Sequence, residues 1–566
     1  MAARTTKIMR NLIALIVVGL LIDLTHATLT DQLAEQQNVL RGAASPWLWP
    51  HPNSILQSTT PKKQKRIAVI GAGPGGSSFA YYAAQAFPNN EVSIDVYEAS
   101  ERAGGRCHSA TLEISAALGL YHPVEWGASI FIDKNRNLVT AARAFNLSLG
   151  TPALAAAKQQ DTKALKSPPF VTSLWDGSKI LFELDLAHLT WRDKLRAALR
   201  YGAWTPGQVT RLARTAADRL DPVYDHKHPG YDKWADLVRD LGLEAEVQVS
   251  AAEYCRKHDV RAAYTDEVVE AVTRINYGRN LDEVHALAAL VGMTNGETYS
   301  VVGPSVLFFD LLGDNDLIPI TAGGNQQIFG SFLAASKATV HWNTTVTGIA
   351  RVTDNDADEI QYQLETTKDN AIKAEPYDAV VLAVPIPAAR RLSLPPTSAS
   401  LPRVAYHRIH VTHVLGVLNR TTFPSRPAMV MTTRASAHLQ SVSRVRDYAG
   451  ILDGPGIALY KAFSTVPLLD HDGEGGDQLG QVVFERIDRI WNRTWWSYPI
   501  MAPVSPSGEK DAYAPVVLDQ QQPQQDRLGD FKNGIYLLNG FETFLSTMET
   551  ATIAAKNVVR LLQQQQ

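Results

Sequence analysis

The sequence predicts an α/β fold with a Rossmann-like nucleotide-binding domain and a second, discontinuous α+β domain. A βαβ pattern supports the first domain: an apolar strand Ile67–Ile70, a glycine-rich turn, a helix at about 77–86 and a strand Val92–Tyr97. A strand, a turn and a helix follow one another again at 534–562, near the other end of the chain. Because nucleotide-binding elements come from separated parts of the chain, the domains must be discontinuous.

The chain between these two segments can be divided by its predicted secondary structure. Residues 190–290 are predicted to be mostly helical, whereas 339–350 and 377–385 have strand character. Polar breaks at 470–480 and 505–526 indicate surface insertions. The expected regions are 1–27, a signal peptide; 28–64, a linker; 65–150, the first part of the nucleotide-binding domain; 151–318, a helical substrate-binding lobe; 319–390, the second part of the nucleotide-binding domain; 391–530, the second part of the substrate domain with the polar insertions; and 531–566, the closing motif and tail.

Composition excludes several classes of function. With 566 residues, 45% of them hydrophobic, the chain can bury a large core. The 54 basic residues nearly balance the 57 acidic ones, so we expect no nucleic-acid partner. Cys107 and Cys255 are the only cysteines, which excludes a disulfide framework and a cysteine-built metal site. We expect no metal, and a bridge between the two cysteines stays open.

The N-terminus predicts export from the cytosol. Arg4, Lys7 and Arg10 precede a short apolar run, Leu12–Ile22, with small residues after it. An uncleaved signal anchor is the alternative. Four glycosylation sequons support a protein of the secretory pathway, in a lysosome, in a vacuole or outside the cell; they begin at Asn146, Asn343, Asn419 and Asn492.

A dinucleotide fingerprint lies in the turn of the βαβ unit. Residues 71–76 read Gly-Ala-Gly-Pro-Gly-Gly, with glycines at Gly71, Gly73, Gly75 and Gly76. Gly71 permits the tight turn, Gly73 admits the pyrophosphate, and Gly76 lets the helix pack close to the strand. Glu98 closes the second strand, where its carboxylate can accept hydrogen bonds from a ribose. An ordinary structural turn is the alternative.

Two segments that follow resemble the flavin amine oxidase superfamily. Residues 104–106 form a Gly-Gly-Arg extension of the fingerprint, in which Gly105 and Arg106 are cofactor candidates. This resemblance favours FAD over NAD and a Rossmann-like domain of the GR2 type. Residues 125–129 resemble the segment that runs along the isoalloxazine ring, and this adds Gly127, Ala128 and Ser129.

The central and closing segments resemble the same superfamily. The central Gly-Gly turn corresponds to 321–325, and Val346 would carry main-chain contacts to adenine. In the closing motif, Gly540 and Glu542 would lie near the ribityl chain or diphosphate. The amides of Met548 and Glu549 would donate to the pyrimidine edge of the flavin. No cysteine occurs in this motif, so we expect noncovalent FAD.

The combination of 274–278, 323–325 and 534–549 resembles the prenylcysteine oxidase (prenylcysteine lyase) family. The resemblance implies cleavage of farnesyl- or geranylgeranylcysteine with O2 and water to cysteine, a prenyl aldehyde and H2O2, in the breakdown of prenylated proteins. The cofactor supplies the redox chemistry, so the protein must bind, orient and exclude water. The implied partners are the prenylcysteine and O2, with peripheral membrane contact open for a lipid substrate. The oligomeric state does not follow from the sequence.

Three residues of the helical lobe are the candidates for catalysis. Arg274 could meet the cysteinyl carboxylate, and Asn276 or Tyr277 could orient the amino-acid head or water. The alternative is a satisfied hydrogen-bond network at a helix end. Two rival functions are also open: an FAD-dependent amine or polyamine oxidase, and a secreted FAD-fold binding protein without activity.

Overall fold

The computed structural model describes 64–150, 169–294, 298–301, 323–354, 359–367, 375–468, 478–504, 513–520 and 531–563. These residues all belong to the compact unit Lys62–Gln566. The predicted signal peptide, almost all of the predicted linker, and Thr321 and Ala322 of the central turn lie outside the described residues.

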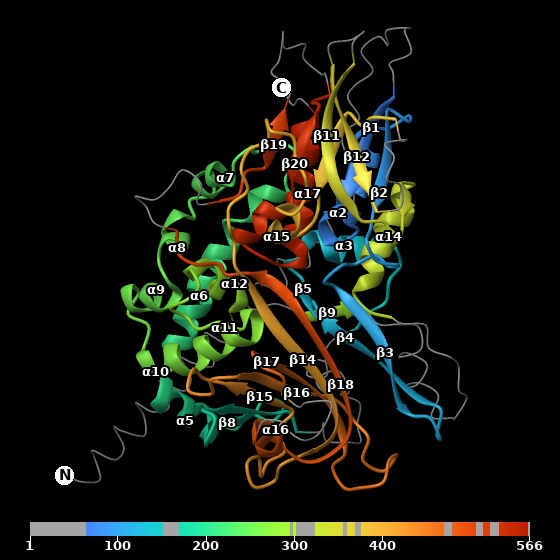
Figure 1. Cartoon of the computed structure of the whole chain (residues 1–566). Helices are drawn as coiled ribbons and strands as arrows, with labels where there is room; N and C mark the ends of the chain where they lie inside the picture. Colours follow the sequence, from blue (N-terminus) through green and yellow to red (C-terminus); the bar gives the residue numbers. More distant parts are fainter. Residues whose placement is uncertain are drawn as a thin grey trace, which may run out of the picture. The chain divides into compact units, whose positions relative to one another are not determined.

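A six-stranded sheet forms the centre of the nucleotide-binding domain (Figure 1). Its strands are parallel except for the edge strand β19. The apolar run in β1 is buried on both faces, as is typical of a parallel sheet covered on both sides. In spatial order the strands are β10 (Thr339–His341), β2 (Val92–Tyr97), β1 (Lys65–Ile70), β13 (Ala379–Leu382), β20 (Gly534–Leu537) and β19 (Val517–Gln520).

The sheet confirms the predicted assembly from separated segments and differs from it in two places. β19 lies in the region 391–530 that was assigned to the substrate domain, yet it pairs with β20. The strand expected at 339–350 is instead β10 and a second strand, β11 (Val346–Asp354). Between them Asn343 adopts a positive φ of 51°, which asparagine tolerates and which turns the chain. β11 forms a hairpin with β12 (Glu359–Thr366).

Four helices accompany this sheet. α2 (Pro74–Ala86) begins three residues before its predicted start, because proline is well suited to the first helical turn. α14 (Gln326–Ser336) and α17 (Met548–Leu562) pack against α2, and α3 (Arg136–Ala144) packs against α17. The start of α2 therefore lies close to the C-terminal closing motif, as the sequence predicts.

A seven-stranded sheet forms the second domain. One face packs against the hairpin of β3 (His108–Ser115) and β4 (Leu120–Gly127). β7 and β8 belong to this sheet although their region was predicted to be helical, and their β-branched and aromatic residues favour strands. The spatial order is β18 (Phe484–Pro499), β14 (Tyr406–Leu418), β17 (Ala458–Ser464), β16 (Leu439–Asp447), β15 (Met429–Thr432), β7 (Val171–Trp175) and β8 (Ile180–Asp185).

Helices from 191 to 292 lie together on the left of Figure 1, from α5 near β8 to α7 near β19, which confirms the predicted helical stretch. They are α5 (Trp191–Tyr201), α6 (Thr205–Asp218), α7 (Trp234–Asp240), α8 (Glu244–Gln248), α9 (Ala251–Lys257), α10 (Ala262–Tyr264), the π-helix η2 (Thr265–Val269), α11 (Glu270–Tyr277) and α12 (Ala286–Gly292), with the 3-10 turn η1 (Asp221–Tyr224). The remaining elements are β5 (Phe131–Ile132), β6 (Leu149–Gly150), β9 (Thr298–Val301), α15 (Ile386–Ala389), α16 (Gln478–Val483) and η3 (Asn539–Thr543).

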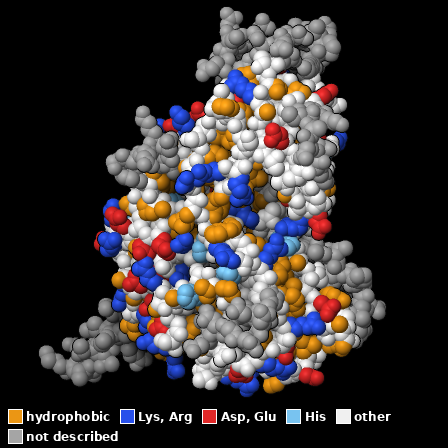
Figure 2. Space-filling model, viewed as in Figure 1, with side chains coloured by type: hydrophobic (Ala, Val, Ile, Leu, Met, Phe, Trp, Pro, Cys, Tyr) orange, Lys and Arg blue, Asp and Glu red, His pale blue; other side chains and the backbone are white. Residues whose placement is uncertain are grey.

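Three further features bear on the sequence predictions. Cys107 and Cys255 are both buried and free, so the bridge that the sequence left open is not formed. Among the described residues no helix is long and apolar enough to cross a membrane. Acidic and basic side chains are interspersed on the face shown in Figure 2.

Candidate functional site

The glycine turn between β1 and α2 contains two glycines that the fold requires and one that leaves open space. A Cβ on Gly71, whose φ is +104°, would lie 2.6 Å from the Ala383 carbonyl oxygen, and one on Gly76 would lie 1.9 Å from the Gly71 oxygen. The fold therefore demands both glycines. Gly73 has an ordinary φ of −73°, and a Cβ there would meet its nearest atom, Gly105 Cα, only at 3.8 Å. The open space beside Gly73 fits a ligand that approaches the backbone.

Glu98 lies against this turn. Its carboxylate accepts hydrogen bonds from the Ala72 amide at 2.8 Å and from the Ser100 amide at 2.9 Å. Its own carbonyl accepts from the Thr344 amide at 2.9 Å, two residues before the buried Val346. The end of β2 and the start of β11 are thus adjacent, as required if Glu98 and Val346 are to hold opposite sides of one adenosine.

The glycine doublet crosses directly over the glycine turn. The Gly104 amide donates to the Ala72 carbonyl at 2.8 Å, and both doublet glycines have positive φ, +99° and +53°. A Cβ on Gly105 would lie 3.1 Å from Gly73 Cα. Only glycines permit this approach of two backbones, so the doublet and the turn form one continuous binding surface.

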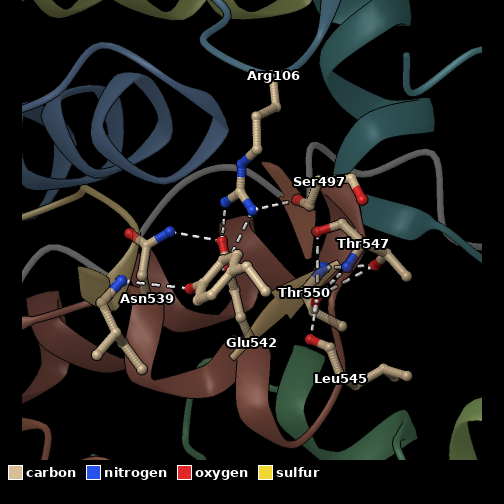
Figure 3. Close-up of polar contacts among 9 residues, drawn as sticks. Arg106, Ser497, Asn539, Glu542, Leu545, Thr547 and Thr550 are labelled. Atoms are coloured by element: carbon tan, nitrogen blue, oxygen red, sulfur yellow. Dashed lines mark hydrogen bonds and ion pairs between the residues drawn. The ribbon is translucent and has the colours of Figure 1, made fainter. Parts of the chain in front are cut away.

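Arg106 and Glu542, predicted separately as cofactor residues, form an ion pair (Figure 3). Arg106 Nη1 also donates to the Ser497 carbonyl at 2.6 Å, and the Tyr406 hydroxyl donates to Glu542 at 3.0 Å. Burial lowers the Arg106 pKa, but the Glu542 carboxylate more than offsets this and raises it. The guanidinium therefore stays charged, and Ser497 and Tyr406 connect the pair to the seven-stranded sheet.

The start of α17 is fixed by a capping box (Figure 3). The Thr550 amide donates to Thr547 Oγ1 at 3.0 Å, and the Thr547 amide donates back to Thr550 Oγ1 at 2.9 Å. The amides of Met548 and Glu549 lie in the first turn, where helix geometry gives them no intrahelical partner. Their predicted use toward a flavin is thus compatible with the backbone.

Two residues of the closing motif, Glu549 and Gly540, make structural contacts. The Glu549 carboxylate accepts from the Asn137 and Leu138 amides at 2.8 and 3.0 Å and so caps α3. Burial raises the pKa of Glu549 to about 7. A Cβ on Gly540 would lie 2.8 Å from Trp234 Nε1, so the packing of α7 requires this glycine. This packing accounts for the glycine, and the cofactor role of Gly540 stays a prediction.

Gly127, Ala128 and Ser129 leave β4 where both sheets meet the central turn. A Cβ on Gly127 would lie 2.4 Å from the Trp495 ring, and the Ala128 carbonyl accepts from Asn325 Nδ2 at 2.7 Å. Ala128 has a positive φ of 57°. The predicted ring-binding segment is therefore held in an uncommon backbone conformation by contacts from distant segments.

Lys461 on β17 is the functional candidate that the sequence analysis missed. Its ammonium donates to the Glu125 carbonyl at 2.5 Å and to Ser129 Oγ at 2.6 Å. Burial lowers the pKa of Lys461, and the Glu125 carboxylate opposes this shift. The sequence does contain a signal for Lys461, because this lysine interrupts the mostly apolar strand Ala458–Ser464. A buried charge needs a hydrogen-bonding or charged partner, or a functional role.

The three residues predicted for catalysis do not converge on this site. Arg274 donates to the Ser436 and Leu439 carbonyls and to Asn280, which joins α11 to the turn before β16. Tyr277 is buried, with its ring edge-on to Tyr498 at 5.5 Å, and Asn276 is exposed. Arg274 is therefore committed to internal contacts, which argues against the predicted contact with a substrate carboxylate.

A cavity of about 570 Å³ adjoins the doublet on its other side. Arg102, Leu333, Lys337 and Trp342 line it together with Gly323 of the central turn, whereas the glycine turn, Glu98, the glycine doublet and the start of α17 do not. We therefore do not assign this cavity to the nucleotide.

Two family models match successive parts of the chain. A model of the NAD(P)-binding Rossmann-like domain matches residues 69–145, and the prenylcysteine lyase model matches 185–566. The chain belongs to the prenylcysteine lyase family. Farnesylcysteine lyase of Arabidopsis thaliana is 24% identical over 93% of both chains. Prenylcysteine oxidase 1 of Mus musculus is 23% identical over 89% of this chain and 90% of its own.

Solved structures show the fold of this family member to be that of FAD-dependent amine oxidases. A putrescine oxidase bound to putrescine superposes with a TM-score of 0.50 at 16% identity, covering 88% of this chain and 99% of its own. Cyclohexylamine oxidase from Brevibacterium oxydans gives 0.52 at 14% identity, with the same coverages. At this identity the likeness concerns the fold alone, whereas the prenylcysteine lyase model covers both the helical lobe and most of the seven-stranded sheet.

Proposed function

We propose that the chain is an FAD-dependent oxidase that cleaves the thioether of farnesyl- or geranylgeranylcysteine. O2 and water would be consumed, and cysteine, a prenyl aldehyde and H2O2 released. The match of the prenylcysteine lyase model to 185–566 carries this proposal, because that stretch includes the helical lobe and most of the seven-stranded sheet in addition to the later strands of the nucleotide-binding domain.

The residues around the glycine turn fit FAD. The turn and doublet would hold the diphosphate, Glu98 the ribose, and the start of α17 the flavin. When bound, FAD would accept a hydride from carbon next to sulfur and pass the electrons to O2. Binding would be noncovalent: Cys107 is the nearest thiol in sequence to this site, and burial raises its pKa, which makes it a poor nucleophile.

Lys461 supplies fixed positive charge to the same place. Its ammonium contacts the ring-binding segment from the seven-stranded sheet, where little water can screen it. A preorganised buried cation favours negative charge that develops on a group bound beside it. Lys461 can also hold a proton at Nζ for exchange with such a group.

The sheet face that carries Lys461 offers an apolar surface for a prenyl tail. Residues paired across neighbouring strands project to the same side of a sheet. Two rows cross β17, β16, β15, β7 and β8, and six of their ten residues are apolar; we call these ten residues the Lys461 face. The rows are Lys461, Ser443, Met429, Thr172 and Leu184, and Phe463, Ser441, Met431, Leu174 and Phe182.

The secretory pathway is the proposed location, in a lysosome, in a vacuole or outside the cell. The N-terminal sequence carries the argument, together with sequon residues Asn146 and Asn343, which are exposed and so accessible to glycosylation. A lipid-bearing substrate also favours peripheral contact with membranes.

Peroxide release from the purified holoenzyme tests the proposed reaction. We expect peroxide with farnesylcysteine and geranylgeranylcysteine and none with benzylamine or spermine. Shortening farnesyl to geranyl should lower kcat/KM by at least roughly tenfold, because each buried CH2 contributes about 0.8 kcal/mol. Peroxide from the amines and none from the thioethers would refute the proposal and leave the FAD fold intact.

A further inference from the structure

α5 carries a stripe of exposed apolar side chains along its length. Trp191, Leu195 and Leu199 follow at four-residue intervals, so they lie on one side of the helix. Their exposed fractions are 69%, 50% and 69%, and Trp204, just beyond the helix, is 70% exposed. Large side chains in such a row expose an apolar surface that needs an explanation beyond chance.

Contacts on the other side of α5 hold the helix in place without this stripe. Tyr201 is buried with its ring edge-on to Phe182 of β8 at 5.1 Å, and Arg200 forms an ion pair with Glu267 at 2.6 Å. A capping box between Thr190 and Asp193 fixes the first turn. The exposed stripe is therefore free to serve an external partner.

Basic side chains flank the stripe on both sides. Arg192 and Arg196 lie next to it on one side and Lys194 on the other, and all three are exposed. Asp193, the one acidic residue of α5, is engaged in the helix cap and in an ion pair with Arg196, so among the described residues Arg192 and Lys194 carry the unpaired share of this charge. Tryptophan and leucine beside lysine and arginine on one face are typical of helices that lie in the interface of an anionic membrane.

We propose that the α5 stripe, consisting of Trp191, Leu195 and Leu199, docks on the surface of an anionic membrane. The helix would lie in the plane of the interface, with its basic side chains at the lipid headgroups. This placement extends the proposed function, because α5 packs through Phe182 on the β8 end of the Lys461 face. The docking itself does not depend on the reaction. A prenyl tail that leaves a membrane at α5 would thus enter the apolar end of that face.

Co-sedimentation of the full chain with vesicles tests this docking surface. We expect binding to phosphatidylcholine vesicles that contain phosphatidylserine, and weaker binding without it. Leu195→Asp together with Leu199→Asp should reduce the bound fraction at least tenfold. Ile451→Asp, which changes an apolar side chain that is 53% exposed and remote in sequence, is the matched control and should bind like the wild type.

Three results would overturn the inference. One is equal vesicle binding by the double variant and the wild type, and another is no vesicle binding by either. The third is a dimer in sedimentation velocity that Leu199→Asp dissociates, without vesicle binding, because the stripe would then be an interface between two copies. Peroxide release from farnesylcysteine in vesicle-free solution should be unchanged in the double variant, so failure of docking and failure of the proposed reaction give different results.

Discussion

Gly73→Val is expected to abolish FAD retention while the protein stays folded. Gly73 has a backbone conformation that valine can adopt, and the nearest protein atom to a Cβ there is 3.8 Å away. A Cβ at this position therefore meets no clash in the protein itself. It places a branched side chain in the space that the diphosphate needs. Flavin absorbance relative to protein absorbance, with circular dichroism as the measure of folding, checks this result.

Two further glycine variants show that the loss is specific. Gly207→Val, in α6, has open space within 4 Å and should retain full flavin. Gly76→Ala should lower the midpoint of thermal unfolding of the apoprotein, because its Cβ would lie 1.9 Å from the Gly71 oxygen. Full flavin occupancy in Gly73→Val would show that the diphosphate lies elsewhere.

Lys461→Met should lower kcat by roughly 100- to 1,000-fold, the range seen when one preorganised electrostatic or proton-transferring group is lost. FAD should be retained, since the hydrogen bonds of Lys461 go to Glu125 and Ser129 at the edge of the predicted site. Steady-state peroxide release with farnesylcysteine checks the rate, and flavin absorbance checks retention. Lys65→Met, which removes a half-buried lysine at the far end of β1, is the control and should keep its activity.

The pH dependence of kcat separates a direct role of Lys461 from a structural one. Burial lowers the pKa of Lys461, so its proton is lost at a lower pH than from an ordinary lysine. If the ammonium is the active form, kcat of the wild type falls as pH rises through this shifted pKa. Lys461→Met should lack that fall. A variant with reduced rate and the same pH profile as the wild type would assign Lys461 a purely structural role.

The nucleotide-binding elements could be predicted because their determinants are local. The positive φ of Gly71 and the contact of Gly76 with the Gly71 oxygen arise within the turn itself, and the βαβ pattern surrounds both glycines. The closing helix α17 is likewise marked by its capping residues Thr547 and Thr550. Such features leave a signal in a short window of sequence.

The missed features depend on contacts between distant segments. Lys461 reaches the ring-binding segment only because the register of β17 and the packing of β4 bring the two together, 336 residues apart in sequence. Arg274 looked available for a substrate, but its hydrogen bonds go to the Ser436 and Leu439 carbonyls some 160 residues away. β19 lies within the segment 505–526 that was predicted to be a surface insertion, yet it joins the nucleotide sheet by pairing with β20. No local pattern specifies these pairings.

Anaerobic titration of the purified holoenzyme with farnesylcysteine tests the central claim most directly. The absorbance spectrum reports whether electrons pass from the thioether to bound flavin, without the reaction with O2. We predict that farnesylcysteine bleaches the oxidised flavin band and that spermine and benzylamine leave it unchanged. Bleaching by an amine, with an unchanged spectrum after farnesylcysteine, would contradict the claim.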